Sequence, residues 1–190
     1  SLKGFIANSS SNCQIQATGS AGGLFGSNAG GIYQCHSHGN VYSAFGMGGG
    51  LGGANVGNLE RNYSLVNFSE DNQAGFICHN EGTIKNCFSN GVLGNLALAG
   101  FVGDTSGGQV VRCYSACQMN YGIGFMMCSE YAPNGPGKAE SCFWDSDRVI
   151  DEQPSEGVPL TSLEMKNAQN FIDAGWDFVG ETDNGTDDIW

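Results

Sequence analysis

One short element recurs along the chain and limits the folds that are open to it. The element is a glycine, a large apolar residue, a second residue that is usually apolar, and then usually a small one. Its first glycines lie 19, 27, 25, 25 and 24 residues apart. The six copies are Gly4-Phe5-Ile6-Ala7, Gly23-Leu24-Phe25-Gly26, Gly50-Leu51-Gly52-Gly53, Gly75-Phe76-Ile77-Cys78, Gly100-Phe101-Val102-Gly103 and Gly124-Phe125-Met126-Met127. Self-similarity at such a period is typical of repeat architectures.

A second element follows the first in most repeats. It reads apolar, two residues, usually cysteine, often an aromatic, and then often serine. Its copies are Ile32…Cys35-His36-Ser37, Leu59…Asn62-Tyr63-Ser64, Ile84…Cys87-Phe88-Ser89, Val110…Cys113-Tyr114-Ser115 and Ala139…Cys142-Phe143-Trp144. Each apolar run has the length of a short strand and is too short for a helix. Glycine, asparagine and aspartate between the runs supply the positive-φ positions that sharp turns require.

One such unit cannot bury its apolar side alone, but stacked units can. We therefore predict an all-β fold, a right-handed parallel β-helix (solenoid) of about six coils, the handedness following the general preference of parallel crossovers. A β-propeller blade needs a longer period, and a sandwich lacks long-range self-similarity. Stacking in register predicts one interior column of structural core residues: Leu24, Leu51, Phe76, Phe101 and Phe125.

The repeats also resemble a known family. The first element followed by GTIKNCFSNGVL (residues 82–93) is similar to the GLUG motif, and the tail GWDFVGETDNGTDDIW (residues 175–190), preceded by LTSLEMKNAQNFIDA (residues 160–174), resembles the segment that closes such arrays. The resemblance covers nearly the whole chain and implies a secreted or cell-surface protein, mainly bacterial, with no single assigned activity. Gly52 and Met127 depart from the motif, so we expect bulges in those coils.

The composition changes near residue 141. Residues 1–140 carry 5 basic and 7 acidic residues, whereas residues 141–190 carry 2 basic and 12 acidic ones. We therefore divide the chain into a GLUG-like repeat β-helix over residues 1–143 and an acidic C-terminal capping segment over residues 144–190. Thr161 and Glu164 have capping-box spacing, which predicts a short helix near 162–167 and a second turn over 168–174 that ends at Gly175.

The capping segment holds all three tryptophans. Its large apolar side chains are expected to cover the open end of the last coil, because exposed coil ends invite aggregation. Two other interpretations stay open: the tryptophans stack on sugars, or the segment docks a following domain. The tryptophans concerned are Trp144, Trp176 and Trp190.

The net charge of −12 bears on partners. Nucleic acid and anionic membrane surfaces both require a positive footprint, so neither is an expected partner. No run of 18 apolar residues exists that would predict a membrane span. The chain opens in mid-pattern at Ser1–Gly4, so we expect it to be part of a longer multidomain protein, and no signal peptide is visible.

Five of the eight cysteines are assigned to one repeat position, with Asn62 standing in on one coil. The predicted cysteine ladder is Cys13, Cys35, Cys87, Cys113 and Cys142. Stacked cysteines lie within disulfide distance, so a Cys87–Cys113 disulfide is possible on distance alone. The side chains of parallel neighbours point the same way, however, which strains such a bond, and a ladder of buried reduced thiols is preferred. A bend at Asn86 would turn Cys87 inward and leave the aromatic position facing outward.

That outward position gives the candidate ligand-binding residues. They form a predicted aromatic stripe of His36, Tyr63, Phe88 and Tyr114. For metals, the Cys113-x3-Cys117 and Cys35-His36-x-His38 groupings contain ligand-type residues but lack a paired zinc pattern, so no zinc site is expected. Calcium is the one cofactor considered. Its weak candidates are Asp183, Asp187 and Asp188 in an acidic turn without EF-hand spacing.

These observations leave three functional hypotheses. The first is a non-catalytic extracellular or cell-surface module for adhesion or binding, with a glycan or a host or partner protein as ligand. The alternative is a structural spacer or stalk that presents another domain of a larger surface protein. The third is a carbohydrate-active β-helix enzyme, which requires two carboxylates facing each other across a groove. An exposed aromatic stripe favours binding, and a uniformly polar outside favours the spacer.

Overall fold

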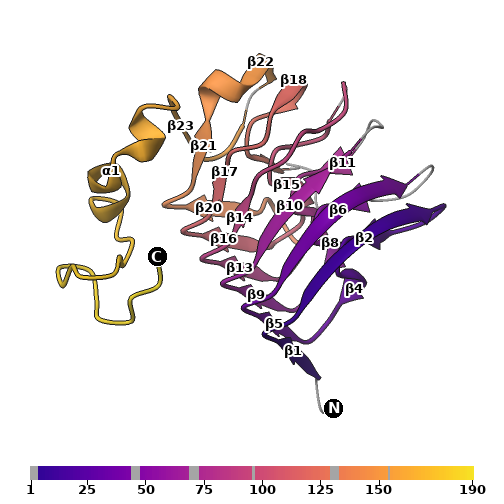
Figure 1. Cartoon of the computed structure of the whole chain (residues 1–190), viewed down its shortest axis with the longest axis horizontal. Coiled ribbons are helices and arrows are strands. Elements are labelled where there is room, and N and C mark those ends of the chain that lie inside the picture. Colours follow the sequence, from indigo (N-terminus) through magenta and orange to yellow (C-terminus); the bar gives the residue numbers. More distant parts are fainter. Residues whose placement is uncertain (1–3, 44–47, 69–72, 96, 129–132, 154) are drawn as a thin grey trace.

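The computed structural model describes residues 4–43, 48–68, 73–95, 97–128, 133–153 and 155–190. The chain is a solenoid of about five turns built from parallel sheets, with one short α-helix near the C-terminus (Figure 1). Within the described residues this confirms the predicted all-β solenoid with a C-terminal segment that contains a short helix.

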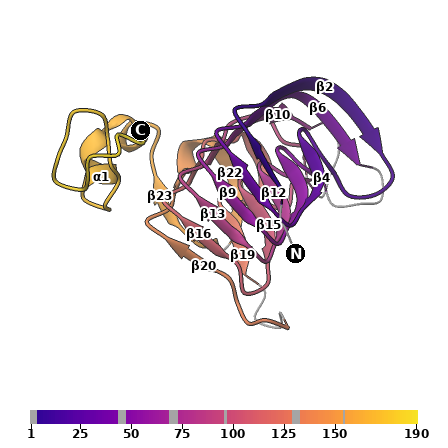
Figure 2. The ribbon, with the colours of Figure 1, turned by 90° about the horizontal axis from the view of Figure 1, so that it is seen from below.

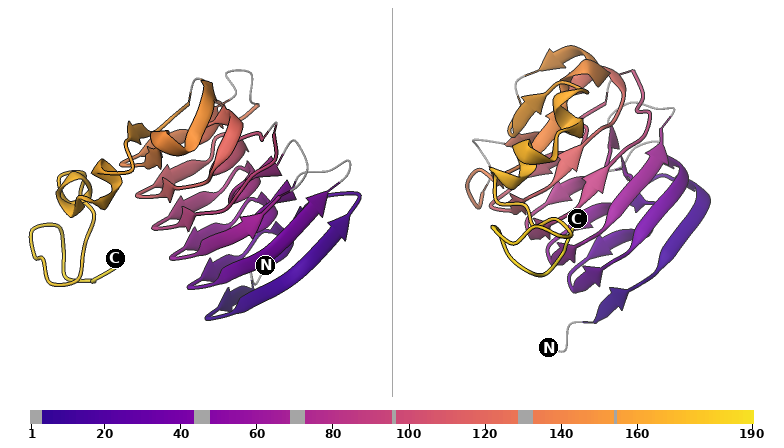
Figure 3. Two further views of the ribbon diagram at one scale, coloured as in Figure 1. Left: turned by 45° about the horizontal axis from the view of Figure 1, so that its top comes forward. Right: turned by 60° about the vertical axis from the view of Figure 1, so that its left-hand side comes forward.

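Four sheets run along the solenoid. Sheet A consists of β1 (Phe5–Ala7), β5 (Gly31–Tyr33), β9 (Asn58–Glu60), β13 (Thr83–Lys85), β16 (Gln109–Val111) and β20 (Lys138–Glu140). Sheet B consists of β2 (Ser10–Ala17), β6 (His36–Ser43), β10 (Tyr63–Asn67), β14 (Phe88–Ser89), β17 (Tyr114–Ser115), β21 (Phe143–Asp145) and β23 (Val158–Leu160). The long strands β2 and β6 project at the indigo end of the stack (Figures 2 and 3).

The other two sheets complete each coil. Sheet C consists of β3 (Ala21–Gly22), β7 (Gly48–Gly49) and β11 (Gln73–Ala74), and parallel bridges continue it through Ala99 to β18 (Met119–Ile123), which pairs with β22 (Val149–Gln153). Sheet D consists of β4 (Phe25–Asn28), β8 (Gly52–Asn55), β12 (Ile77–Asn80), β15 (Val102–Thr105) and β19 (Met126–Cys128). The parallel registers show that each coil winds back over the one before it.

The interior column lies where stacking predicts it. Leu51, Phe76, Phe101 and Phe125 are fully buried in one cluster, and Leu24 is partly buried against it. The rings of Phe76 and Phe101 stack with centroids 4.7 Å apart, and those of Phe101 and Phe125 with centroids 4.9 Å apart. The rings can stack in every coil because the spacing between paired strands is close to the centroid distance that stacked aromatic rings prefer.

The corner between sheets A and B turns on a single residue in each coil. That residue is in the left-handed region and is never glycine: Asn8, Gln34, Arg61, Asn86, Arg112 and Ser141, with φ between 48° and 56°. The first glycines of the Gly-apolar element are needed for a different reason, the lack of space for a side chain. A Cβ on Gly75 would collide with the carbonyl of Gly100, and one on Gly124 would collide with the indole of Trp144. These glycines are therefore needed for close approach between coils.

The first predicted repeat is wrong, and this lowers the number of coils from six to about five. Phe5, Ile6 and Ala7 pair with Gly31, Ile32 and Tyr33 in sheet A, so Gly4-Phe5-Ile6-Ala7 occupies the second element's place in the coil. The chain reaches its first true Gly-apolar element at Gly23. A glycine followed by two apolar residues looks the same in either place, which is why the sequence pattern misled.

The two departures from the motif behave differently. The strand pair β15 and β19, at Met127, has the irregular register expected there, with a shift between Val102 and Thr105. Gly52 instead makes room for a neighbour, since a Cβ at this position would collide with the ring of Phe25 on the preceding coil. The bulge expected at Gly52 is therefore wrong: the ring of Phe25 packs directly on the backbone of Gly52.

A buried asparagine ladder joins the coils between sheets D and A. The Asn28 amide donates to Asn55 Oδ1 and the Asn55 amide donates to Asn80 Oδ1, both at 2.8 Å. Each amide also closes its own turn, as when Gly30 N donates to Asn28 Oδ1 at 3.0 Å. The sequence signal is an Asn-x-Gly triplet that returns once per coil, and it was read only as a set of turn residues.

The C-terminal end of the solenoid is covered by residues 149–160. Strand β22 pairs with β18, β23 pairs with β21, and Ser155 Oγ accepts the Phe125 N–H at 2.9 Å across the end of the core column. Trp144 is 1% exposed and fills the interior below this cover. The boundary placed between residues 143 and 144 thus falls inside β21, and the coils continue to residue 160.

The remaining residues, 161–190, contain the predicted helical turns. A one-turn 3₁₀ segment, η2 (Glu164–Lys166), and the helix α1 (Ala168–Ile172) lie in this part, whereas another 3₁₀ turn, η1 (Ser146–Arg148), directly follows β21. The expected capping box forms: Glu164 Oε2 accepts from Thr161 N at 2.8 Å, and Thr161 Oγ1 accepts from Glu164 N at 3.3 Å. Gly175, at φ 83°, follows α1.

Candidate functional site

The aromatic stripe lies on the outer face of sheet B, one ring per coil. His36 pairs in register with Tyr63, Tyr63 with Phe88, and Phe88 with Tyr114. Ring centroids are 4.6, 4.9 and 5.0 Å apart, and the planes of each pair are within 5° of parallel. All four side chains are half-buried. The left-handed residue two positions earlier sets this direction, since it sends the intervening residue inward and the ring outward.

Parallel stacking limits what this stripe can bind. Both faces of Tyr63 and of Phe88 are covered by the neighbouring rings, so only their edges reach solvent. Stacking on a sugar needs a free ring face, because CH groups of the sugar lie over the π-cloud. The stripe therefore offers a narrow apolar ridge, and its ring faces become available only where the stack ends.

Residues 161–190, called the C-terminal segment from here on, pack against one end of the stripe. Figure 1 shows this segment in yellow beside the last strands of the solenoid. Trp190 lies with its centroid 6.0 Å from Tyr114 and 6.4 Å from Phe88, and Phe171 contacts Phe143 edge-on at 5.0 Å. Phe143 and Phe171 are both buried as a result. Residues 161–190 thus cover the outer face of sheet B at its C-terminal end, near Phe88, Tyr114 and Phe143, whereas residues 149–160 cover the coil end.

A pocket of about 350 Å³ opens between this segment and sheet B. Its lining consists of Tyr114, Ala116, Asp145, Met165, Phe171, Trp176, Phe178 and Trp190. Most of these side chains are apolar, and Asp145 supplies the carboxylate. Burial raises the pKa of Tyr114 to about 12, so its phenol stays neutral at physiological pH. The sequence had pointed to Tyr114 and the tryptophans but not to Asp145, Met165, Phe171 or Phe178 as parts of one site.

The three tryptophans have separate environments. Trp144 lies in the solenoid core, where a sugar cannot reach it. Trp176 is 1% exposed, and its Nε1–H donates to the Ser141 carbonyl at 2.9 Å. Trp190 is half-buried at the pocket. Sugar stacking by Trp144 is therefore ruled out by its position, and Trp176 and Trp190 are left as pocket walls.

The cysteine ladder lies inside the corner between sheets A and B. Cys35, Cys87, Cys113 and Cys142 are buried. The sulfurs of Cys87 and Cys113 accept backbone N–H groups from the coil before: Asn62 N donates to Cys87 Sγ at 3.3 Å, and Cys87 N donates to Cys113 Sγ at 3.4 Å. All four are free thiols, and burial raises the pKa of Cys113 well above its ordinary value. A buried thiol of this kind is inert.

Cys13 does not belong to this ladder. It pairs in register with Gly39 on β6, and its thiol donates to the Gly23 carbonyl at 3.6 Å. The ladder position in that coil is Ser9, whose N–H donates to Cys35 Sγ at 3.4 Å. The error follows from the misplaced first repeat. Asn62 does take the ladder place, where Oδ1 accepts from Cys35 N at 2.8 Å.

In the described part of the chain, the side chains considered as metal ligands do not form a cluster. Among the described residues no group of three or more His, Cys, Asp or Glu side chains is arranged to hold a metal ion. In the acidic turn Asp188 Oδ1 accepts from Gly180 N at 3.3 Å, while the Asp183 and Asp187 amides donate to Glu181 and Asp177 at 2.9 Å each. The Asp188 carboxylate and the backbone N–H groups of Asp183 and Asp187 are thus parts of local turns. Calcium binding by Asp183, Asp187 and Asp188 stays a prediction.

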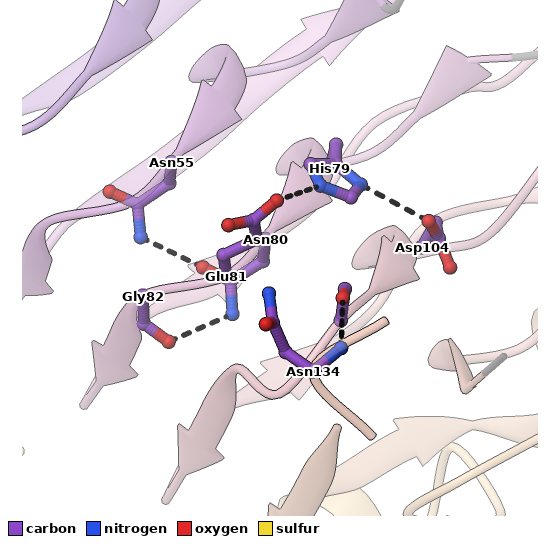
Figure 4. A network of polar contacts seen from close by, with 8 residues as sticks. Asn55, His79, Asn80, Glu81, Gly82, Asp104 and Asn134 are labelled. Carbon is purple, nitrogen blue, oxygen red and sulfur yellow. Dashed lines mark hydrogen bonds and ion pairs between the residues drawn. The ribbon is translucent and has the colours of Figure 1, made fainter. Parts of the chain in front are cut away.

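A polar network on the outer side of sheet D joins residues one coil apart (Figure 4). His79 Nδ1 lies 3.1 Å from Asp104 Oδ2, and its Nε2 lies 3.1 Å from Glu81 Oε1. Both ring nitrogens contact carboxylates, and the contact with Asp104 joins two neighbouring coils. The step of 25 residues from His79 to Asp104 is one coil, and the two residues pair in register on β12 and β15.

Comparison with known proteins adds little beyond the repeats. No family model matches the chain, and no solved structure matches it. A "Putative Gly-rich membrane protein" of Evansella cellulosilytica is 28% identical over 85 residues, which are 43% of this chain and 10% of that protein. Membership of the GLUG-motif family stays a prediction. None of the helices in the described part of the chain is long and apolar enough to cross a bilayer.

Proposed function

We propose that this chain is a non-catalytic binding module that meets its partner at the pocket between sheet B and the C-terminal segment. The observation that carries the proposal is the pocket itself, where aromatic side chains from both parts converge around one carboxylate. Such an arrangement, mostly apolar with few polar groups, is typical of ligand sites. A β-solenoid is consistent with a structural or binding repeat module.

The setting we propose is the cell surface or the extracellular space, which the resemblance to GLUG repeats implies. A glycan or a surface protein is then the partner class. The role of the coils is to hold the sheet B side of the pocket rigid.

The test is a titration of the chain with a panel of glycans and surface peptides, followed by tryptophan fluorescence. We expect a saturable change with at least one member and its loss in Trp190→Ala. Tyr121→Ala is the matched control, because Tyr121 is a partly exposed aromatic on β18 outside the pocket lining. Equal binding by wild type and Trp190→Ala would place the site elsewhere.

The spacer remains a second candidate because of the stripe. Rings that cover one another stabilise the stack along its axis and leave few faces for a ligand. A spacer predicts that Phe88→Ala lowers the force needed to unfold the module in single-molecule pulling. It also predicts that Trp190→Ala leaves every partner interaction of the parent protein unchanged, which is the reverse of what the binding proposal expects.

A further inference from the structure

We propose that the pocket on sheet B selects a cationic ligand, an alkylated ammonium group such as a choline-type headgroup or a methylated amine. This inference rests on the proposed function and gives that site its ligand chemistry. Three observations carry it: the angles between the aromatic walls, the buried carboxylate, and the charge of the surrounding segment.

The pocket walls differ from the stripe in how their rings meet. Trp176 is tilted by 34° from Trp190 and by 71° from Phe171, and Tyr114 is tilted by 49° from Trp190. Tyr114 and Trp190 are half-buried, so parts of these two tilted rings stay accessible at the pocket, whereas Trp176 and Phe171 are buried. An ammonium group over an aromatic face is attracted by the ring quadrupole, and the attraction grows when water is excluded.

Asp145 supplies a negative group without a basic partner. It is 7% exposed, and it lines the pocket. Its oxygens accept from Ser162 Oγ at 2.8 Å and from Asp147 N at 3.2 Å, which are neutral donors. Within the described ranges, ion pairs form at His79 and none at Asp145. A buried carboxylate costs free energy unless a positive charge compensates it, and a bound cation would do so.

The surroundings reinforce this preference. Residues 141–190 contain 12 acidic residues and only Arg148 and Lys166 as basic ones, a balance of −10. A field of one sign raises the local concentration of counter-ions of the other sign. A neutral sugar gains nothing from this field. It also needs several placed donors and acceptors, whereas the oxygens of Asp145 are already engaged and most of the lining is apolar.

The experiment is a titration of the full chain with choline and with its uncharged isostere 3,3-dimethylbutanol, read by tryptophan fluorescence and calorimetry. We expect saturable binding of choline and about tenfold weaker binding of the isostere, the size of one desolvated cation–π contact. Asp145→Asn should weaken choline about tenfold, and Trp190→Leu should do the same without altering a buried hydrogen bond.

Asp151→Asn is the control, because it removes the same charge from an exposed position on β22. It should leave choline affinity within about twofold, since surface charges are screened. Equal affinity for choline and the isostere, no choline binding at millimolar concentration, or unchanged binding in both pocket variants would overturn the cationic ligand. If a neutral glycan then binds in a Trp190-dependent way, the proposed function survives and only its ligand class is wrong.

Discussion

At the corners between sheets A and B from Gln34 onward, one left-handed residue is followed by a buried side chain that takes part in the backbone hydrogen bonding. Cys87 Sγ accepts from Asn62 N, and its own thiol donates to the Lys85 carbonyl at 3.0 Å. Asn62 does the same with an amide: it accepts from Cys35 N and donates to the Ile32 carbonyl, both at 2.8 Å. Asparagine can take the place of cysteine here because each is small and offers both a donor and an acceptor.

This equivalence predicts the outcome of a substitution. Cys87→Asn should cost less than about 1 kcal/mol, whereas Cys87→Val should cost about 1–3 kcal/mol because it leaves the buried Asn62 N–H unpaired. Urea unfolding with a common m-value measures both. Cys13→Ala serves as the control, since Cys13 accepts no backbone N–H in the corner. Equal stability of the Asn and Val variants would show that the thiol is only a space filler.

The buried thiol of Cys78 and the buried phenol of Tyr114 make the stability of the fold sensitive to high pH. Burial, followed by the nearby Asp104, raises the pKa of Cys78 to about 12, and burial raises that of Tyr114 to about 12. The unfolded chain releases these protons nearer pH 9 for the thiol and pH 10 for the phenol. Between those values and pH 12 the unfolded state binds fewer protons, so the free energy of unfolding falls as pH rises.

The measurement is the urea midpoint as a function of pH. It should decline from about pH 9 upward, and Tyr114→Phe should decline less steeply because one of the retained protons is gone. A midpoint that stays level from neutral pH to pH 11 would mean that these groups are as accessible to solvent in the fold as in the unfolded chain.

At the level of elements, the sequence pattern predicted the parallel solenoid and the ring column, because residues of one kind return at one coil position. It failed at Gly4–Ala7, where the local pattern of a strand in sheet A is the same as that of the repeat's first element. It also ended the coils too early, since β22 and β23 lack glycine-apolar patterning and join the solenoid through pairing with β18 and β21. Composition alone could not reveal that pairing.

The column gives the strongest stability prediction for an element. Phe101 lies between Phe76 and Phe125 and is fully buried, so Phe101→Ala should cost about 3–5 kcal/mol through lost burial and a cavity. Phe101→Asp should cost more, since it also places an unpaired charge in the core. Chemical denaturation measures both, and Val56→Ala, at a 48% exposed position, should change little. A Phe101→Asp variant that melts like wild type would contradict the column.

At the level of the whole molecule, two parts of the C-terminal region cover two different surfaces. Residues 149–160 close the coil end, and residues 161–190 lie on the outer face of sheet B. The sequence predicted a cap but not this division, because the packing of Phe171 on Phe143 depends on the direction in which the chain leaves β23. The pocket is lined by residues of sheet B and of the segment 161–190. Its complete lining could not be predicted from the sequence for the same reason.

The division predicts different results for two truncations. Removing residues 161–190 should lower Tm by about 10 °C or less, because it exposes Tyr114 and Phe143 but leaves the coil end covered. Removing residues 149–190 exposes Phe125 and Trp144, and should cause aggregation. Circular dichroism melting and light scattering distinguish the two. Similar behaviour of both truncations would show that the outer segment also supports the coil end.

Because of where the tryptophans lie, tryptophan fluorescence follows the unfolding of only one end of the molecule. All three of them, Trp144, Trp176 and Trp190, lie in or beside the last coil. Indole emission therefore follows loss of structure at that end, while the far-ultraviolet signal sums over every turn. Should the turns peel away one after another, as nearest-neighbour contacts permit, the two signals will separate along a denaturant axis, and their order will reveal which end frays first.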